Sequence, residues 1–194
     1  MTEPAPSLPA MPARFSVERY LALVDEGVLS EDDRVELLEG VVVAMSPRNP
    51  PHDTSVSMVC RALITAIAHR AAVRCQSTLI LGQHSAPEPD VAVVEGRERD
   101  YRARHPTTAL LIVEVADSSL AQDRLTKAVL YATAGIPEYW IINLRDQCIE
   151  VLRQPIREQR RYVERRIVRT GEQLEIAALP GVRVAVDDLL PDVD

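Results

Sequence analysis

The feature that most constrains this chain is a glutamate inside a continuous apolar segment. Residues 109–116 are all apolar except Glu114. Such a run is typical of a central strand covered on both faces, and side-chain alternation places Leu110, Ile112, Glu114 and Ala116 on one face. A carboxylate there must be paired, neutralised or bound to a metal, because leaving it charged and alone costs several kcal/mol or more. Glu114 is therefore a candidate functional residue.

The residues that follow this strand predict a βαβ unit. Residues 122–134 have a helical pattern that Gly135 and Pro137 end, and residues 139–143 form a second buried apolar run. A strand, a helix and a strand at this spacing predict two adjacent or near-adjacent parallel strands joined by a right-handed crossover. The helix carries Lys127.

The rest of the chain predicts a mixed α/β fold with an antiparallel end. Residues 1–13 are rich in Pro, Ala and Ser and predict a disordered tail, which leaves residues 14–194 as a single domain. Helices are expected at 17–24, where Ser16 is the N-cap, and at 53–73. Strands are expected at 41–45, 77–81, 91–94, 148–152, 162–168, 174–176 and 182–186.

Composition and charge limit the functional classes. The formal charge of -7 argues against a protein that coats nucleic acid with its whole surface. Between residues 151 and 170, however, seven Arg stand against two Glu, a local charge of about +5. This stretch is either a solvated strand pair protected from edge pairing or a surface that faces phosphates.

Location is predicted from the cysteines and from the absence of targeting signals. The three cysteines lack the paired spacing of a zinc site, so we expect them to be reduced and partly buried. No apolar run approaches the ~20 residues that span a bilayer, and residues 1–12 do not resemble a signal peptide. A cytoplasmic protein without a membrane partner is the simplest expectation.

Asp90 offers a second carboxylate that could act with Glu114. It follows Pro89 and opens the strand predicted at 91–94. Carboxylates on neighbouring strands, ~4.8 Å apart, can share one cation, and Mg²⁺ prefers such oxygen ligands together with water and phosphate oxygens. The ion would lower the pKa of a bound water and offset charge on a phosphodiester, while Lys127 could orient that water.

Each of these residues also has an ordinary structural interpretation. Asp90 could simply end a loop. Lys127 lies four residues after Asp123, so the two could form an exposed ion pair on a helix that stabilises the fold only slightly. Glu36 could be an acid on the surface of a helix. Glu114 is the hardest to explain in this way, because its neighbours are apolar.

At this point the sequence resembles a known family, the Uma2 family, also described as DUF820, within the PD-(D/E)xK nuclease superfamily. The motifs that carry the resemblance are Glu36-Leu37-Leu38-Glu39-Gly40, Pro87-Glu88-Pro89-Asp90-Val91, Val113-Glu114-Val115, Asp123-Arg124-Leu125-Thr126-Lys127 and the stretch 131–140, with His52 opening a helix. The resemblance covers roughly residues 15–190.

The resemblance implies a restriction-endonuclease-like core, in which a central mixed β-sheet is flanked by helices and holds a divalent metal at its edge. Asp90 matches the metal-binding aspartate, Glu114 the acid of the (D/E)xK element, and Glu36 an N-terminal acid associated with such sites. The position two after Glu114 is Ala116 and not lysine. In the Uma2-like arrangement the lysine comes from the following helix, here Lys127. Roles for His52 and Gln76 stay open.

Two functional hypotheses follow. The first is a Mg²⁺-dependent endonuclease, with Mn²⁺ as a substitute, that hydrolyses nucleic acid and is expected to act on DNA. Asp90, Glu114 and Glu36 are its expected metal ligands and Lys127 its water-orienting residue, and symmetric duplex cleavage would favour a homodimer. The second is a binding or assembly module that keeps the nuclease fold without turnover.

Overall fold

The computed structural model describes residues 14–191. The predicted disordered tail, residues 1–13, lies outside the described residues. That residues 14–194 form one domain also stays a prediction.

The described chain contains four α-helices and ten strands. The helices are α1 (Val17–Asp25), α2 (Pro50–Ile67), α3 (Leu120–Gln122) and α4 (Ala128–Ala134), with a π turn, η3 (Asp123–Lys127), between the last two. The strands are β1 (Val35–Leu38), β2 (Val41–Ala44), β3 (Ala72–Cys75), β4 (Val91–Val94), β5 (Leu111–Ala116), β6 (Glu138–Asn143), β7 (Cys148–Ile156), β8 (Arg161–Val168), β9 (Gln173–Glu175) and β10 (Arg183–Ala185). Short 3₁₀ turns lie at Glu31–Asp33, Glu98–Tyr101, Arg157–Gln159 and Val186–Asp188.

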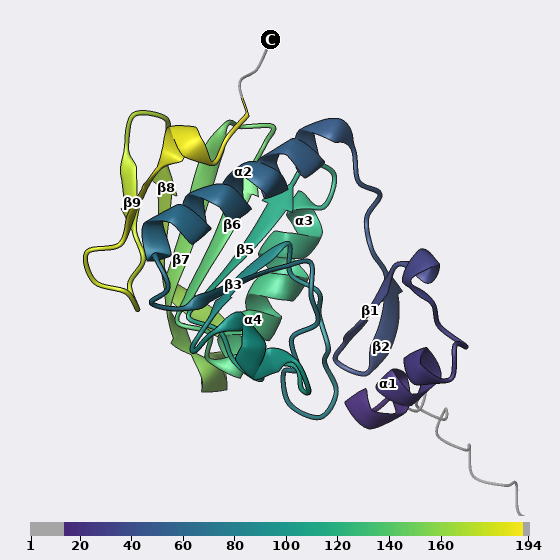
Figure 1. Cartoon of the computed structure of the whole chain (residues 1–194). Coiled ribbons are helices and arrows are strands. Elements are labelled where there is room, and N and C mark those ends of the chain that lie inside the picture. The colour runs from purple at the N-terminus through teal and green to yellow at the C-terminus, as the bar shows by residue number, and fades with distance from the viewer. Residues whose placement is uncertain (1–13, 192–194) are drawn as a thin grey trace, which may run out of the picture.

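A six-stranded mixed sheet forms the centre, in the order β3-β4-β5-β6-β7-β8. Strands β5 and β6 are parallel, as the βαβ pattern predicts, and every other pair is antiparallel. Helix α2 crosses one face of the sheet, and α3 and α4 lie against the other (Figure 1). The predicted fold class, a central mixed sheet flanked by helices, is confirmed.

The two faces of β5 pack against different cores, as alternation requires. Val113 and Val115 point into the cluster under α2, while Ile112 and Ala116 join the cluster under α4. Glu114 shares the α4 face. Leu110 precedes the strand and packs with the α2 cluster instead, so its predicted place beside Glu114 is wrong.

The N-terminal part forms a separate layer beside the sheet. Strands β1 and β2 form an antiparallel hairpin, and Ser16 caps α1 by accepting a hydrogen bond from the Arg19 backbone N–H, as predicted. Leu37 bridges to Ala86 in the segment that leads to β4. This bridge holds the hairpin beside the segment that leads to Asp90 and the start of β4.

Three predictions between residues 50 and 81 are wrong. Helix α2 begins at Pro50, capped by Asn49, and ends at Ile67, because the next two residues take left-handed conformations. The strand of this region is β3 and not residues 77–81, which have no ladder partner strand. The expectation of reduced cysteines is wrong for Cys60 and Cys75, which form a disulfide between α2 and the end of β3. Cys148 is free and buried.

The predicted antiparallel C-terminal extension is confirmed. Strands β7 and β8 complete the main sheet, and β9 and β10 form a separate two-stranded sheet. Several arginines of this stretch are paired with acids, including Arg153 with Glu138 and Arg165 with Glu150. These ion pairs favour the structural interpretation of the Arg-rich stretch. No helix within residues 14–191 has the length and apolar character needed to cross a membrane.

Glu150 on β7 anchors the π turn to the sheet. Its buried carboxylate accepts hydrogen bonds from Arg124 of the π turn at 3.0 Å and from Arg165 of β8 at 2.7 Å. Burial alone would raise the pKa of Glu150, but the two guanidinium groups lower it. The turn that carries Lys127 is thus tied to β7 by charge.

Replacing Glu150 with Gln should lower the free energy of unfolding by about 1–3 kcal/mol near neutral pH, because charge-assisted hydrogen bonds are lost. The pKa of Glu150 is below its ordinary value of 4.5 in the folded state. The stabilisation that ionised Glu150 contributes to the fold is therefore fully present above its ordinary pKa and is lost as pH falls through the folded-state pKa. Urea unfolding at several pH values should show the gap between wild type and Glu150→Gln closing in acid. The exposed Glu158→Gln control should match wild type throughout.

Candidate functional site

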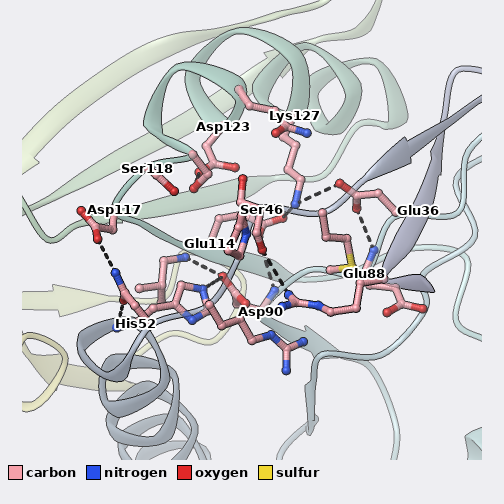
Figure 2. A pocket seen from close by; sticks show the side chains of 18 residues that line it. Glu36, Ser46, His52, Glu88, Asp90, Glu114, Asp117, Ser118, Asp123 and Lys127 are labelled. Atoms are coloured by element: carbon pink, nitrogen blue, oxygen red, sulfur yellow. Dashed lines mark hydrogen bonds and ion pairs between the residues drawn. The ribbon is translucent and has the colours of Figure 1, made fainter. Parts of the chain in front are cut away.

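The predicted site residues meet in one pocket although they come from four parts of the chain. Glu36 lies on β1, Asp90 immediately before β4, Glu114 in the middle of β5 and Lys127 at the end of the π turn. Figure 2 shows their side chains converging. We call this set, together with Asp123, the carboxylate pocket. All five side chains are buried, with between 1% and 8% of each residue exposed.

Asp90 and Glu114 lie side by side on neighbouring strands. The β4–β5 register pairs Val91 with Val113, which places Asp90 opposite Glu114. The backbone N–H of Asp90 donates to Oε2 of Glu114 at 3.4 Å, and the Val115 N–H donates to Oδ2 of Asp90 at 2.9 Å. The predicted juxtaposition of the two carboxylates is thus present.

Lys127 makes a buried ion pair with Glu114. Its Nζ lies 2.9 Å from Oε1 of Glu114 and 3.5 Å from Oε1 of Glu36. Burial by itself would lower the pKa of Lys127, but the carboxylates of Glu114, Glu36 and Asp123 raise it above its ordinary value. The amine therefore stays a charged ammonium. The interpretation of Lys127 as half of an exposed helix pair is wrong.

The π turn explains how the helix brings Lys127 to this position. The helical stretch from α3 to α4 is continuous except for one wider turn at Asp123–Lys127. Such π bulges often mark functional sites, because one extra residue re-aims the side chains of that turn. Lys127 is also the only lysine of the chain. Although arginine is the common cation here, the buried position holds the one compact ammonium.

Glu114 carries a strongly shifted pKa. The pKa of Glu114 is raised to about 8: burial is the largest cause, the charge of Lys127 opposes the shift, and the nearby carboxylates of Asp90, Asp123 and Glu36 add to it. Oε1 of Glu114 also accepts a hydrogen bond from the Tyr131 hydroxyl at 2.7 Å. The pKa is raised although Lys127 is paired with this carboxyl, so the ionised form of Glu114 would be stabilised further by a second cation.

Asp90 has the opposite tendency and stays ionised. Burial would raise its pKa, but the hydrogen bond and charge of His52, the Val115 N–H and the charge of Lys127 bring the pKa below its ordinary value. His52 Nε2 lies 3.3 Å from Oδ2, and Gln76 Nε2 donates to Oδ1 at 3.3 Å. His52 and Gln76, whose roles the sequence left open, thus hold the Asp90 carboxylate in place.

Glu36 faces the pocket from a strand and not from a helix surface. Only 1% of the residue is exposed, and its Oε2 accepts a hydrogen bond from the Glu88 backbone N–H at 3.2 Å. The interpretation as a helix-surface acid is wrong, because residues 35–38 pair with β2.

The sequence did not identify two residues of the site, Asp123, which lines the pocket, and Tyr131, which contacts Glu114. Asp123 is buried, and burial raises its pKa to about 6 although Lys127 and a hydrogen bond from Ser119 oppose the shift. Tyr131 donates a hydrogen bond from its hydroxyl to Glu114. Asp123, Lys127 and Tyr131 are spaced by four, which puts them on one side of a helix. This spacing is the sequence signal that places Asp123 and Tyr131 on the same side of the helix as Lys127.

The donor set suits a hard divalent cation. Four buried carboxylates surround one ammonium and one imidazole, so the pocket holds more negative than positive charge, and oxygen donors are what Mg²⁺ prefers. Within residues 14–191, no three His, Cys, Asp or Glu side chains are already arranged to hold a metal ion. An ion bound by Asp90 and Glu114 would thus take its other ligands from water or substrate. The metal roles of Asp90, Glu114 and Glu36 stay predictions.

Comparison with known proteins agrees with this architecture. A solved structure titled as that of a "putative nuclease belonging to DUF820" from Anabaena variabilis ATCC 29413 is similar, with a TM-score of 0.69 and 16% sequence identity. The match covers 90% of this chain and 97% of that one, and at this identity it shows a shared fold. No curated protein matches the chain significantly.

The family model adds evidence from the sequence. The model of Uma2, described as "Putative restriction endonuclease", matches residues 17–187. That range contains every residue of the carboxylate pocket and all the motifs that carry the resemblance. The chain therefore belongs to the Uma2 family.

Proposed function

We propose that this protein is a Mg²⁺-dependent endonuclease that hydrolyses phosphodiester bonds of nucleic acid, with DNA as the expected substrate. The observation that carries the proposal is the buried meeting of Asp90, Glu114 and Lys127 at the junction of two neighbouring strands. The family description and the solved DUF820 relative support a nuclease.

The carboxylates have the role of holding the cation. Asp90 and Glu114 are the principal ligands, and Glu36 approaches from β1 as a third acid. The raised pKa of Glu114 supports this role, because a bound cation would supply the positive charge that stabilises its ionised form. Mn²⁺ is the expected substitute, since it accepts the same oxygen ligands.

The other residues orient the reacting groups. Mg²⁺ held by these carboxylates would lower the pKa of a water and offset negative charge on the phosphate. In hydrolysis a water oxygen bonds to phosphorus as the bond from phosphorus to the leaving oxygen breaks, and the leaving oxygen gains a proton as the water loses one. The Lys127 ammonium orients that water or stabilises the developing negative charge. His52 and Gln76 position Asp90, and Tyr131 positions Glu114, so these three act as positioning residues.

A second candidate is the nuclease fold acting as a binding or assembly module without turnover. One observation favours it: Lys127 already occupies Oε1 of Glu114, and among the described residues no three-residue metal group is preformed. This candidate predicts a nucleic-acid or protein complex without cleavage in Mg²⁺ or Mn²⁺.

The single domain over residues 14–194, the homodimer and the cytoplasmic location stay predictions as well.

Replacing Asp90 with Ala should abolish both metal binding and cleavage, because it removes a proposed ligand whose lowered pKa keeps it ionised. Isothermal titration of Mg²⁺ or Mn²⁺ measures the first effect, and gel assays on mixed DNA and RNA substrates measure the second. Thermal unfolding of the same samples shows whether the fold is intact.

The matched control is Asp25→Ala, which changes an exposed acid at the end of α1. It should bind metal and cleave as wild type does. Cleavage by a folded Asp90→Ala protein at the wild-type rate would remove Asp90 from the mechanism. Absence of cleavage by wild type on every substrate, in either metal, would favour the binding module.

Replacing Lys127 with Gln should lower the cleavage rate by about 10²–10³-fold, the usual cost of removing one group that stabilises transition-state charge. Metal binding should persist or strengthen, because the ammonium that competes for Glu114 is gone. Rapid-quench kinetics and titration on the same preparation separate the two effects. Lys127→Arg should restore little activity, because the larger planar guanidinium does not fit the space of a compact ammonium. If Lys127→Gln instead lost all metal binding together with its activity, Lys127 would be a purely structural residue.

A further inference from the structure

A second cleft adjoins the carboxylate pocket and has the opposite charge. Its volume is about 520 Å³, and it shares Arg34, Met45, Arg48 and Glu88 with the pocket as lining residues. We call it the arginine cleft, after Arg34, Arg48 and Arg74, which line it together with His105. Glu88 is the one acid of its lining among the described residues.

The basic side chains of the cleft come from separate elements. Arg34 precedes β1, Arg48 follows β2, Arg74 lies on β3, and His105 belongs to the loop after β4. Three guanidinium groups in one hollow repel one another unless an anion lies between them. In a chain of net charge -7, this local excess of positive charge points to a specific anionic ligand.

Arg74 gives the second, independent observation. The central carbon of its guanidinium lies over the ring of Tyr101, 5.5 Å from the ring centroid, which is a cation–π contact. Within residues 14–191, Nε of Arg74 is the one buried side-chain nitrogen or oxygen without a hydrogen-bond partner. A buried donor left unsatisfied costs free energy, so this N–H is the expected partner of an oxygen acceptor that enters the cleft.

The chemistry of the cleft selects phosphate among anions. Arginine forks bind phosphate oxygens with two parallel hydrogen bonds, and phosphate contacts position nucleic acid without reading its sequence. Arg34 and Arg48 line both cavities, so a strand whose phosphodiester lies at Asp90 and Glu114 continues directly past them. The cleft thus meets the backbone of the same strand.

We propose that the arginine cleft binds a backbone phosphate of the nucleic acid beside the phosphodiester held in the carboxylate pocket. The proposal rests on the proposed function. Arg74 is the central contact, with Arg34, Arg48 and His105 around it. The cleft sets the register of the strand, and the carboxylate pocket carries out the reaction.

The test measures DNA binding without cleavage. Fluorescence anisotropy with the whole protein, a short labelled DNA of mixed sequence and EDTA gives the affinity over a salt series from about 50 to 200 mM. Arg74→Ala and Arg48→Ala should each weaken binding about tenfold, as expected for one charged hydrogen-bonding contact. Each should also reduce the salt slope by about 0.7–0.9, the value for one phosphate contact.

Arg61→Ala is the matched control, since it removes the same charge from an exposed position of α2 outside the cleft lining. Its affinity and salt slope should equal those of wild type. Arg48 is exposed, so its variant keeps the test valid if Arg74→Ala fails to fold. In cleavage assays Arg48→Ala should raise KM, because it removes a contact that binds the backbone beside the reacting phosphodiester.

The outcomes separate this proposal from the proposed function. Wild-type affinity in both cleft variants, or an equal loss in Arg61→Ala, overturns the cleft as the phosphate site even if Asp90→Ala abolishes cleavage. Absence of DNA binding by wild type also overturns it, and the metal titration and cleavage assays then judge the endonuclease alone. Weaker binding confined to Arg74→Ala and Arg48→Ala supports the cleft whether or not turnover is found.

Discussion

The buried ion pair between Lys127 and Glu114 links the main parts of the site. Glu114 belongs to the central strand β5, and Lys127 to the π turn that leads to the parallel strand β6. Separating a buried pair typically costs about 3–5 kcal/mol, because one charge is left uncompensated. The pair therefore holds the crossover against β5. Glu36 reaches the same ammonium at 3.5 Å and joins the β1–β2 layer to it.

Charge is divided between two neighbouring cavities. The carboxylate pocket concentrates acids around one ammonium, while the arginine cleft concentrates guanidinium groups around one acid, and both are lined by Arg34 and Arg48. The first arrangement suits a cation and the second an anion. Metal and phosphate backbone are the pair of opposite charges that a phosphodiesterase must hold together, so the two cavities fit one function.

Sequence patterns predicted the parts of the site that depend on local rules. The apolar neighbours of Glu114 placed it in a buried strand, and the strand–helix–strand spacing placed Lys127 on the crossover. Patterns failed where long-range contacts decide. Cys60 meets Cys75 only when α2 packs near β3. A local stop was missed as well: Ala68 and His69 take left-handed conformations that end α2 six residues before the predicted position. The sequence left an exposed pair of Asp123 and Lys127 open, because helical spacing alone does not show which side of the helix faces the sheet.

The division between sequence and tertiary structure follows from the range of the forces involved. Alternation of apolar side chains, capping residues and turn residues act over a few positions, so the linear chain already determined that β5 is buried and carries a lone carboxylate. Its partners were decided only by folding. Strand register sets Asp90 against Glu114, the π turn re-aims Lys127, and the bridge from Leu37 to Ala86 brings the hairpin of Glu36 to the site. These contacts join residues far apart in sequence, and electrostatic and packing forces select them only when the whole sheet has assembled.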